Sequence, residues 1–274
     1  MSASIQRPRF SIVVAVLNGA PALGACLASV AHQTFLDHEV VVIDGGSTDG
    51  TQQVIQSFGD LVSYQESKPD RGISHAWNKA IPHAQGEWVL FLGADDVLAH
   101  PDVLERASGE LDARSASVAY GRVELLDLSG RVSTTLGEPW SETSETFRYR
   151  NTIPHQGVFH RRDLFDRNGL FDERFRICAD YDLLMREVLR TAPLFLGFTV
   201  AQMGYGGLSN RASSGLRATR EFEWARRKNR LTKIPDWLSP RVWRAAVYEL
   251  LRRAFGQRVA RSVADAYKAF TPRR

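Results

Sequence analysis

The segments VVVIDGGSTDGT (Val40–Thr51) and GEWVLFLGADD (Gly86–Asp96) decide the fold. In each, an apolar run of strand length ends in a carboxylate, Asp44 in the first and Asp95 with Asp96 in the second. Continuous apolar runs are typical of strands that are buried on both faces of a parallel sheet. Ligands of open α/β sheets bind at the carboxyl ends of such strands. The two segments therefore predict acidic groups where a nucleotide and its metal ion could be held.

Strands and helices are predicted to alternate through the first hundred residues. Apolar, β-branched runs predict strands at 10–17, 40–43, 61–66 and 88–92, and apolar spacing predicts helices at 21–33, 49–58 and 73–81. This order predicts an α/β fold with a mostly parallel sheet, flanking helices and right-handed crossovers.

After Asp96 the alternation loosens. The pattern predicts a helix at 101–111, a hairpin over 117–136, a strand at 155–160, a helix at 179–190 and a strand at 194–203.

Composition narrows the class of protein. The 274 residues, 43% of them hydrophobic, suit one large domain with a small appendage. Cys26 and Cys178 are far apart in sequence and call for no disulfide, so a reducing compartment is expected. The N-terminus has no apolar signal-peptide core, and no apolar run reaches the length of a membrane span. A cytoplasmic location is expected.

The C-terminal part carries an unequal share of the charge. Sixteen of the 35 Lys and Arg residues lie in Ser214–Arg274, against five of the 31 Asp and Glu residues, giving net +11 there and −7 elsewhere. Two domains are predicted, at 1–213 and 214–274. The second is predicted to be a basic helical extension with an apolar stripe that includes Trp243, Val247 and Leu250. We expect this stripe to pack on the first domain, while anionic lipid could attract the arginines.

Taken in order, the motifs allow a family to be named. From Phe10 to about Arg211 the chain resembles the family 2 glycosyltransferases, which have a GT-A fold. The pairing of VIDGGSTDGT with DRGI (Asp70–Ile73) and a strand ending in DD is similar to the branch that builds bacterial polysaccharides. The resemblance implies an inverting, metal-dependent enzyme that transfers a sugar from a nucleotide sugar. The donor is usually UDP-linked, and the acceptor a hydroxyl of a glycan or lipid-linked glycan.

The resemblance also implies roles for single residues of the nucleotide site. Val16 and Asn18 lie beside the nucleoside, Asp44 hydrogen-bonds the base, and Arg71 contacts the base as well. Arg211, in the segment YGGLSNR, is expected to contact the diphosphate.

Asp95 and Asp96 match the metal motif of the family, commonly D-x-D-D, in which Gly93 here replaces the first aspartate. Asp95 is assigned to the ribose and the metal, and Asp96 to the metal. Mg²⁺ or Mn²⁺ is the expected cofactor, because hard oxygen ligands suit an ion that bridges a diphosphate.

The general base is assigned to Asp180 in CADYDL (Cys178–Leu183), with Asp182 as the alternative. A position at a helix N-terminus keeps a carboxylate ionised and able to accept a proton. His155 and Gln156 are assigned to the acceptor site.

Simpler interpretations remain for these residues. Asp44 could only start a turn, Asp180 could only cap a helix, Arg71 could be a surface residue and His155 a core histidine.

Other functions fit the sequence less well. A sugar nucleotidyltransferase would carry a Gly-rich basic loop after the first strand, but AVLNGAPAL (Ala15–Leu23) has no Lys or Arg. A non-catalytic protein that binds nucleotide sugars or glycans stays open as an alternative. No nucleic-acid partner is predicted, because the basic extension contains no recognisable reading module.

Overall fold

The structure, a computed structural model, describes residues 7–112, 116–204 and 215–270. The chain divides into two compact units, Met1–Gly207 and Leu208–Arg274, and each is considered by itself. The predicted domain boundary after residue 213 remains a prediction.

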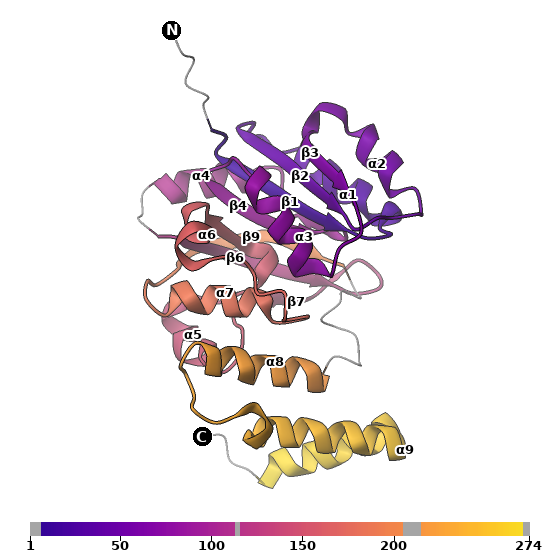
Figure 1. The fold of residues 1–274 in the computed structure, drawn as a ribbon, viewed down its shortest axis with the longest axis vertical. Helices are drawn as coiled ribbons and strands as arrows, with labels where there is room; N and C mark the ends of the chain where they lie inside the picture. Colours follow the sequence, from indigo (N-terminus) through magenta and orange to yellow (C-terminus); the bar gives the residue numbers. More distant parts are fainter. Residues whose placement is uncertain (1–6, 113–115, 205–214, 271–274) are drawn as a thin grey trace. The chain divides into compact units, whose positions relative to one another are not determined.

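The N-terminal unit is built on one mixed sheet (Figure 1). In the described residues its strand order is β3-β2-β1-β4-β8-β6-β9-β5, and β7 pairs with β6. The strands are β1 (Phe10–Val16), β2 (His38–Asp44), β3 (Val62–Ser67), β4 (Trp88–Gly93), β5 (Asp96–Leu98), β6 (Val118–Leu126), β7 (Val132–Leu136), β8 (Val158–Arg161) and β9 (Leu194–Met203).

Helices connect many of these strands, and those in the first hundred residues lie where the sequence predicts them. They are α1 (Ala20–Ala31), α2 (Thr51–Ser57), α3 (Ile73–Ala80), α4 (Val103–Asp112), α5 (Trp140–Phe147), α6 (Asp163–Asn168) and α7 (Ala179–Val188). The four strands β3, β2, β1 and β4 run parallel, which confirms the predicted alternation.

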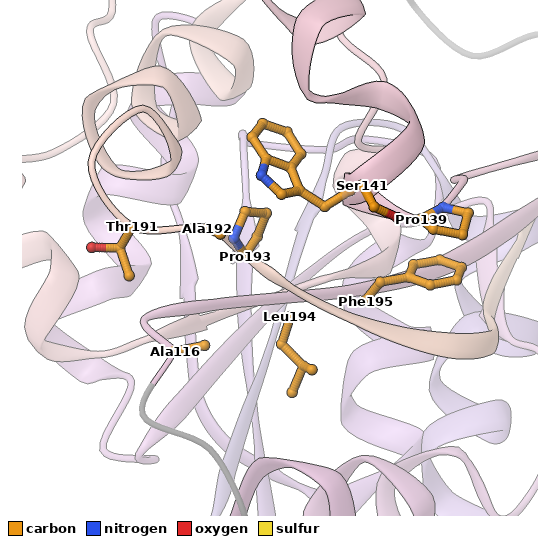
Figure 2. Close-up of a pocket in the computed structure, with 9 residues that line it drawn as sticks. Ala116, Pro139, Ser141, Thr191, Ala192, Pro193, Leu194 and Phe195 are labelled. Atoms are coloured by element: carbon orange, nitrogen blue, oxygen red, sulfur yellow. The ribbon is translucent and has the colours of Figure 1, made fainter.

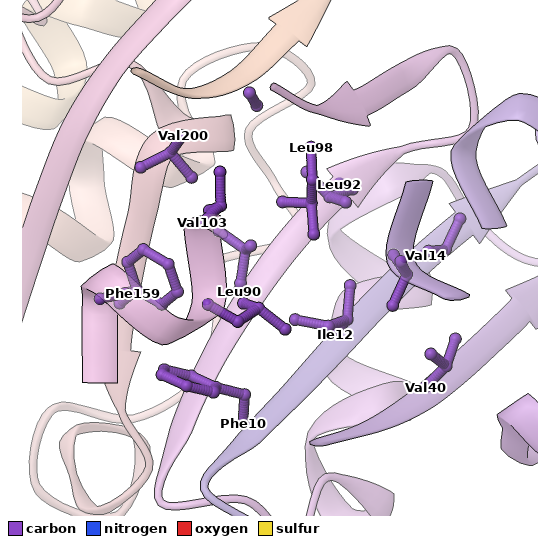
Figure 3. Packing of buried hydrophobic residues seen from close by; sticks show 14 of the residues in the cluster. Phe10, Ile12, Val14, Val40, Leu90, Leu92, Leu98, Val103, Phe159 and Val200 are labelled. Atoms are coloured by element: carbon purple, nitrogen blue, oxygen red, sulfur yellow. The ribbon is translucent and has the colours of Figure 1, made fainter. Parts of the chain in front are cut away.

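Helices pack on both faces of the sheet because successive strand residues point to opposite faces. On one face, Phe10, Ile12 and Val14 of β1 join Leu90 of β4 and Val103 of α4 in the main core cluster (Figure 3). Every one of these five side chains is fully buried.

On the opposite face, Phe91 of β4 lies at the centre of an aromatic cluster. Its ring centroid is 5.6 Å from that of Trp77 in α3, 6.1 Å from Phe165 in α6 and 5.2 Å from Phe171. Residues far apart in sequence are thereby fixed against the middle of the sheet.

The second half of the sheet is antiparallel at several places. β8 pairs antiparallel with both β4 and β6, and the predicted hairpin is formed by β6 and β7. The strand predicted at 155–160 begins later, because His155–Gly157 form a 3₁₀ turn before β8. β5 pairs with the end of β9, which brings Asp96 opposite Met203.

The C-terminal unit contains α8 (Gly215–Lys228), a 3₁₀ turn (Asp236–Leu238) and α9 (Pro240–Phe270). α9 is interrupted at Gly256, whose φ of 83° and ψ of 170° are not helical. Within the unit, the buried Glu223 carboxylate pairs with Arg226 at 2.8 Å and Arg241 at 3.3 Å.

Within the C-terminal unit, Trp243, Val247 and Leu250 of α9 are 61%, 50% and 67% exposed, so that unit does not bury them itself. The expected packing of this apolar stripe on the first domain remains a prediction. No described helix is long and apolar enough to cross a membrane.

Candidate functional site

The carboxyl ends of β1, β2 and β4 meet at one edge of the sheet. Val16 of β1 lies opposite Asp44 of β2, and Ala15 lies opposite Gly93 of β4. This register brings the predicted nucleotide residues of β1 and β2 to the same edge as Asp95 and Asp96, which follow β4 directly.

Asn18 joins the loop after β1 to the loop after β2. It adopts a left-handed backbone conformation, with φ of 50°, which Asn tolerates better than most residues. Its backbone N–H donates to Ser47 Oγ at 2.7 Å, and its Oδ1 accepts from the Thr48 N–H at 2.9 Å. The turn leaves the neighbouring Leu17 side chain 59% exposed at this edge.

Asp44 is fully buried, and its carboxylate is occupied by donors from the protein. Oδ1 accepts from Ser47 N at 3.0 Å and Ser47 Oγ at 2.5 Å, while Oδ2 accepts from Gln52 Nε2 at 2.7 Å and Ser67 Oγ at 2.6 Å. Burial acts to raise the pKa of Asp44, but the hydrogen bonds from Ser47 and Ser67 outweigh it and hold the pKa below its usual value. These donors were not predicted from the sequence. The base contact of Asp44 remains a prediction.

Arg71 is engaged with another part of the unit. Its guanidinium donates to Glu173 Oε2 from Nε at 3.1 Å and from the terminal nitrogen at 2.6 Å, and the side chain is 68% exposed. A contact from Arg71 to a base would compete with this exposed ion pair.

Asp95 and Asp96 converge on the space above Gly93. From the point that a Cβ on residue 93 would occupy, Asp96 Oδ2 is 2.8 Å away and Asp95 Oδ1 is 3.0 Å away. A larger side chain at this position would push the pair aside. Asp95 and Asp96 can therefore take these positions only because residue 93 is a glycine and not the first aspartate of the motif.

The two carboxylates differ in their surroundings. Asp96 is 2% exposed, and its Oδ2 accepts from the Gly93 N–H at 2.7 Å, whereas Asp95 is exposed. Burial, and after it the charge of Asp95, raise the pKa of Asp96 to about 7, against hydrogen bonds from Gly93 and Gln156 that lower it. Two carboxylates of this kind favour a nearby cation.

Asp95 and Asp96 supply only some of the ligands that a divalent ion needs. The described residues contain no group of three or more His, Cys, Asp or Glu side chains that could hold a metal. Mg²⁺ is commonly bound by one or two carboxylates together with substrate phosphates and waters. Asp95 and Asp96 therefore suit a site that a diphosphate completes.

Asp180 lies in the first turn of α7, as predicted. Its Oδ2 accepts from Asn151 Nδ2 at 3.1 Å. The alternative base, Asp182, is fully buried and forms an ion pair with Arg186 one helical turn along. Asp182 thus has a structural partner that limits its availability to a substrate.

Of the two residues predicted for the acceptor site, His155 is buried among aromatic side chains. His155 is 7% exposed and lies against Trp77, at a centroid distance of 4.6 Å, and near His160, at 5.7 Å. Neither His155 ring nitrogen has a hydrogen-bond partner among the described residues. Gln156 is one of the groups that lower the pKa of Asp96, so its side chain lies near that carboxylate. Arg211 lies outside the described residues.

The hollow drawn in Figure 2 is elsewhere. It has a volume of about 400 Å³ and is lined by residues that include Trp140, Pro193 and Phe195. Phe195 is near the start of β9, whereas Met203 at its other end pairs with Asp96. A strand of this length spans roughly 30 Å, so this hollow is separate from the carboxylate edge.

Comparison with known proteins identifies the family. The sequence profile described as glycosyl transferase family 2 matches residues 11–165. A PGL/p-HBAD biosynthesis glycosyltransferase of Mycobacterium bovis is 35% identical over 214 residues, covering 74% of this chain and 80% of the relative. The succinoglycan biosynthesis protein ExoO of Rhizobium meliloti is 30% identical over 191 residues, covering 65% of this chain and 55% of that protein.

Solved structures confirm the GT-A fold. S. aureus TarS residues 1–349, in complex with UDP-GlcNAc, matches with a TM-score of 0.66 at 21% identity, over 90% of this chain and 72% of that chain. The mannosyltransferase PcManGT from Pyrobaculum calidifontis, in complex with GDP-Man and Mn²⁺, matches with a TM-score of 0.60 at 22% identity, over 98% and 77% of the two chains. With the profile covering more than half of its length, this chain belongs to glycosyl transferase family 2 and is an enzyme of that family.

Proposed function

We propose that this chain is an inverting glycosyltransferase that moves a sugar from a UDP-sugar to a hydroxyl of a glycan or lipid-linked glycan. The observation that carries the proposal is the convergence of Asp95 and Asp96 above Gly93, at the carboxyl edge of the parallel strands. An edge of this kind is where α/β sheets bind nucleotides. In this proposal the two carboxylates hold the cation that the diphosphate of such a donor needs.

Asp95 and Asp96 would hold Mg²⁺ or Mn²⁺ together with the donor diphosphate. When bound, such an ion neutralises the negative charge that the leaving diphosphate develops. Asp95 offers the exposed carboxylate, while the buried Asp96 carboxylate is held by the Gly93 N–H. Support for the ion comes from the relative PcManGT, which was solved with Mn²⁺.

Asp180 serves as the general base in this proposal. The acceptor oxygen attacks the anomeric carbon from the face opposite the diphosphate, and its proton passes to the Asp180 carboxylate. As the new glycosidic bond forms, the bond from the anomeric carbon to the phosphate oxygen breaks, which inverts the configuration. Asn151 orients Asp180 through the hydrogen bond to Oδ2, and the helix N-terminus favours the ionised form of Asp180.

Assembly of a cell-surface polysaccharide or glycolipid is the proposed setting. Two relatives are named for PGL/p-HBAD biosynthesis and for succinoglycan biosynthesis. We propose that assembly takes place on the cytoplasmic side, where sugar nucleotides are made.

The C-terminal unit is proposed to bind anionic membrane from that side. Exposed Trp243, Val247 and Leu250 supply apolar contact, and the net charge of +11 over Ser214–Arg274 supplies attraction. Each Lys or Arg near an anionic surface contributes roughly 1 kcal/mol. Sedimentation with vesicles of phosphatidylglycerol should deplete the protein from solution, and phosphatidylcholine vesicles should not. Equal sedimentation with both would contradict this role.

The proposed donor site is tested by thermal shift with UDP, GDP and dTDP, each with Mn²⁺ or with EDTA. We expect UDP with Mn²⁺ to raise the melting temperature of the wild type and of Asp180→Asn alike. Asp180→Asn should lose transfer to acceptor while keeping this shift, because the base acts after donor binding. Retained transfer by Asp180→Asn would contradict the base assignment. A shift that UDP produces equally in EDTA would contradict the metal.

A further inference from the structure

The hollow of about 400 Å³ in the N-terminal unit lies away from the carboxylate edge (Figure 2). Its walls come from segments that are distant in sequence, namely the start of α5, the turn after α7 and the start of β9. None of the residues assigned above to the nucleotide, the metal or the acceptor lines it. Small-molecule sites have volumes of roughly 300–1,000 Å³, so the hollow is large enough for a ligand of its own.

Two aromatic side chains form much of the apolar lining. Trp140 and Phe195 are both half-buried, so each ring keeps an accessible surface. Trp140 is held by the Phe147 ring, at a centroid distance of 5.4 Å. Phe195 is held by the Tyr120 ring, at 5.3 Å, and by the Arg122 guanidinium, 5.1 Å from the ring centroid. Both rings are therefore fixed before a ligand binds, which lowers the entropy cost of binding.

The polar groups of the lining are uncharged donors. None of the nine lining residues is acidic or basic. Among the described residues, no acceptor takes a hydrogen bond from the Trp140 indole N–H, the Ser141 hydroxyl or the Thr191 hydroxyl. Ser141 and Thr191 are also exposed, so their hydroxyls are open to a ligand. These groups suit a neutral ligand that has oxygen acceptors and an apolar face.

A sugar ring combines these two properties. Its C–H groups form an apolar face that an aromatic side chain can cover, and its hydroxyls accept hydrogen bonds at the edge of the ring. A phosphate or carboxylate ligand is typically held by Arg or Lys side chains, which the lining lacks. The chemistry of the hollow therefore favours a neutral saccharide over a nucleotide or an anionic group.

Two helices connect the hollow with Asp180. α5 begins at Trp140 in the hollow and ends at Phe147, whose carbonyl accepts from the Tyr181 hydroxyl, next to Asp180. α7 carries Asp180 in its first turn and ends shortly before Thr191. A helix of this length spans roughly 15 Å. The hollow and Asp180 thus lie at opposite ends of one helix pair, a separation that linked sugar units of a single chain can bridge.

We propose that the hollow binds a neutral sugar unit of the acceptor glycan, remote from the hydroxyl that receives the new sugar. This inference rests on the proposed function and adds a second point of attachment for the same acceptor. Trp140 covers the face of the sugar ring, while Ser141 and Thr191 donate to its oxygens. An acceptor bound at the hollow has a raised effective concentration near Asp180, so long acceptors bind more tightly than short ones.

Isothermal titration with neutral oligosaccharides tests this site in the absence of donor. The probes are cellohexaose, laminarihexaose and maltohexaose. We expect the wild type to bind at least one of them, and Trp140→Ala to raise the Kd about tenfold, because truncation of an aromatic anchor removes a large part of the binding free energy. Trp237→Ala is the matched control, since it removes an exposed tryptophan of the C-terminal unit, and it should keep the wild-type Kd.

Thr191→Arg provides a second variant in case Trp140→Ala folds poorly. Thr191 is exposed, so the fold should tolerate the longer side chain. The arginine would occupy the hollow and bring a charge into its neutral lining, and oligosaccharide binding should again weaken about tenfold. The same Kd in the wild type, Trp140→Ala and Thr191→Arg would overturn the inference.

The thermal shift that UDP produces with Mn²⁺, measured on the same samples, separates this inference from the proposed function. Trp140→Ala and Thr191→Arg should keep the shift of the wild type, because the hollow is distant from the carboxylate edge. A wild type that shows the shift but binds none of the three hexasaccharides would overturn the inference alone. A wild type that shows no shift and transfers no sugar would overturn the proposed function, and with it the acceptor role of the hollow.

Discussion

The ends of β2 and β4 look alike in sequence and differ in the structure. β2 ends at a carboxylate and β4 is followed by one within three residues, and both carboxylates, Asp44 and Asp96, are buried. Asp44 accepts from Ser47, Gln52 and Ser67, and its pKa is low. Asp96 lies beside a second carboxylate, and its pKa is raised to about 7.

In the described part of the chain, two buried histidines next to β4 also have ring nitrogens without hydrogen-bond partners. His155 and His160 are buried next to β4, and both His155 ring nitrogens and His160 Nε2 have no partner among the described residues. Polar groups left unpaired in a folded protein cost stability, and such sites often serve a function. A carboxylate whose oxygens accept hydrogen bonds from the protein, such as Asp44, serves to hold the structure together. A carboxylate with few donors around it, such as Asp96, can bind a ligand.

The largest expected effect is on activity at the β4 end. Asp95→Asn should lower transfer at least 100-fold, about 3 kcal/mol in transition-state stabilisation, because one proposed metal ligand is lost. Its free energy of unfolding should change by less than about 0.5 kcal/mol, because Asp95 is exposed. Initial rates of sugar transfer and urea denaturation measure the two. A rate near that of the wild type would break the comparison, and so would a stability loss above about 2 kcal/mol.

At the β2 end the expected effect is on stability. Asp44→Ala removes the acceptor for Ser47, Gln52 and Ser67, and we expect the free energy of unfolding to fall by about 3 kcal/mol. Urea denaturation of the metal-free protein measures the loss. Asp49→Ala, an exposed carboxylate in the loop that follows β2, is the control and should cost less. Equal losses in the two variants would mean that the donors around Asp44 contribute little.

The buried histidines make stability depend on pH. Burial lowers the pKa of His160 to about 4, against an ordinary value of 6.5, although the Val89 carbonyl raises it slightly. Between these two pKa values, His160 binds a proton in the unfolded chain but not in the folded chain. Its contribution to the free energy of unfolding is therefore fully present above pH 6.5 and is lost as the pH falls towards 4. We expect His160 to account for about 2 kcal/mol of loss between pH 7 and pH 5.

His160→Gln should remove that part of the loss, as measured by urea denaturation at a series of pH values. His32→Gln changes an exposed histidine and should leave the pH profile unaltered. Profiles of the wild type and His160→Gln that run parallel would contradict a neutral His160.

The smallest effect is expected at Gly93. An added methyl in Gly93→Ala would stand 2.8 Å from Asp96 Oδ2 and 3.0 Å from Asp95 Oδ1. We expect about tenfold weaker Mn²⁺ binding, measured by titration in the presence of UDP. Unchanged Mn²⁺ affinity would show that the convergence above Gly93 does not form the metal site.

The sequence predicts the strands and the edge where they end, because both depend on local patterns. Apolar runs and glycine turns specify β1, β2 and β4, and parallel pairing then aligns Val16 with Asp44. It could not predict which carboxylate is occupied. Ser67 reaches Asp44 from 23 residues away and Glu173 reaches Arg71 from 102 residues away, so only the fold brings them together.

Two other assignments stay predictions. Gln156 was assigned to the acceptor, and in the structure it lies near Asp96, because β8 pairs beside β4. Trp243, Val247 and Leu250 are exposed on their own unit, and helical spacing shows which residues share a face but not what covers that face.

The central claim is that the β4 end, and not the β2 end, holds the metal with the donor diphosphate. Electron paramagnetic resonance of Mn²⁺ titrated into the protein with UDP tests it most directly. The account predicts bound Mn²⁺ that requires UDP, disappears in Asp95→Asn, and persists in the folded fraction of Asp44→Asn. Equal Mn²⁺ binding by the wild type and Asp95→Asn would contradict the account, as would loss of Mn²⁺ from folded Asp44→Asn alone.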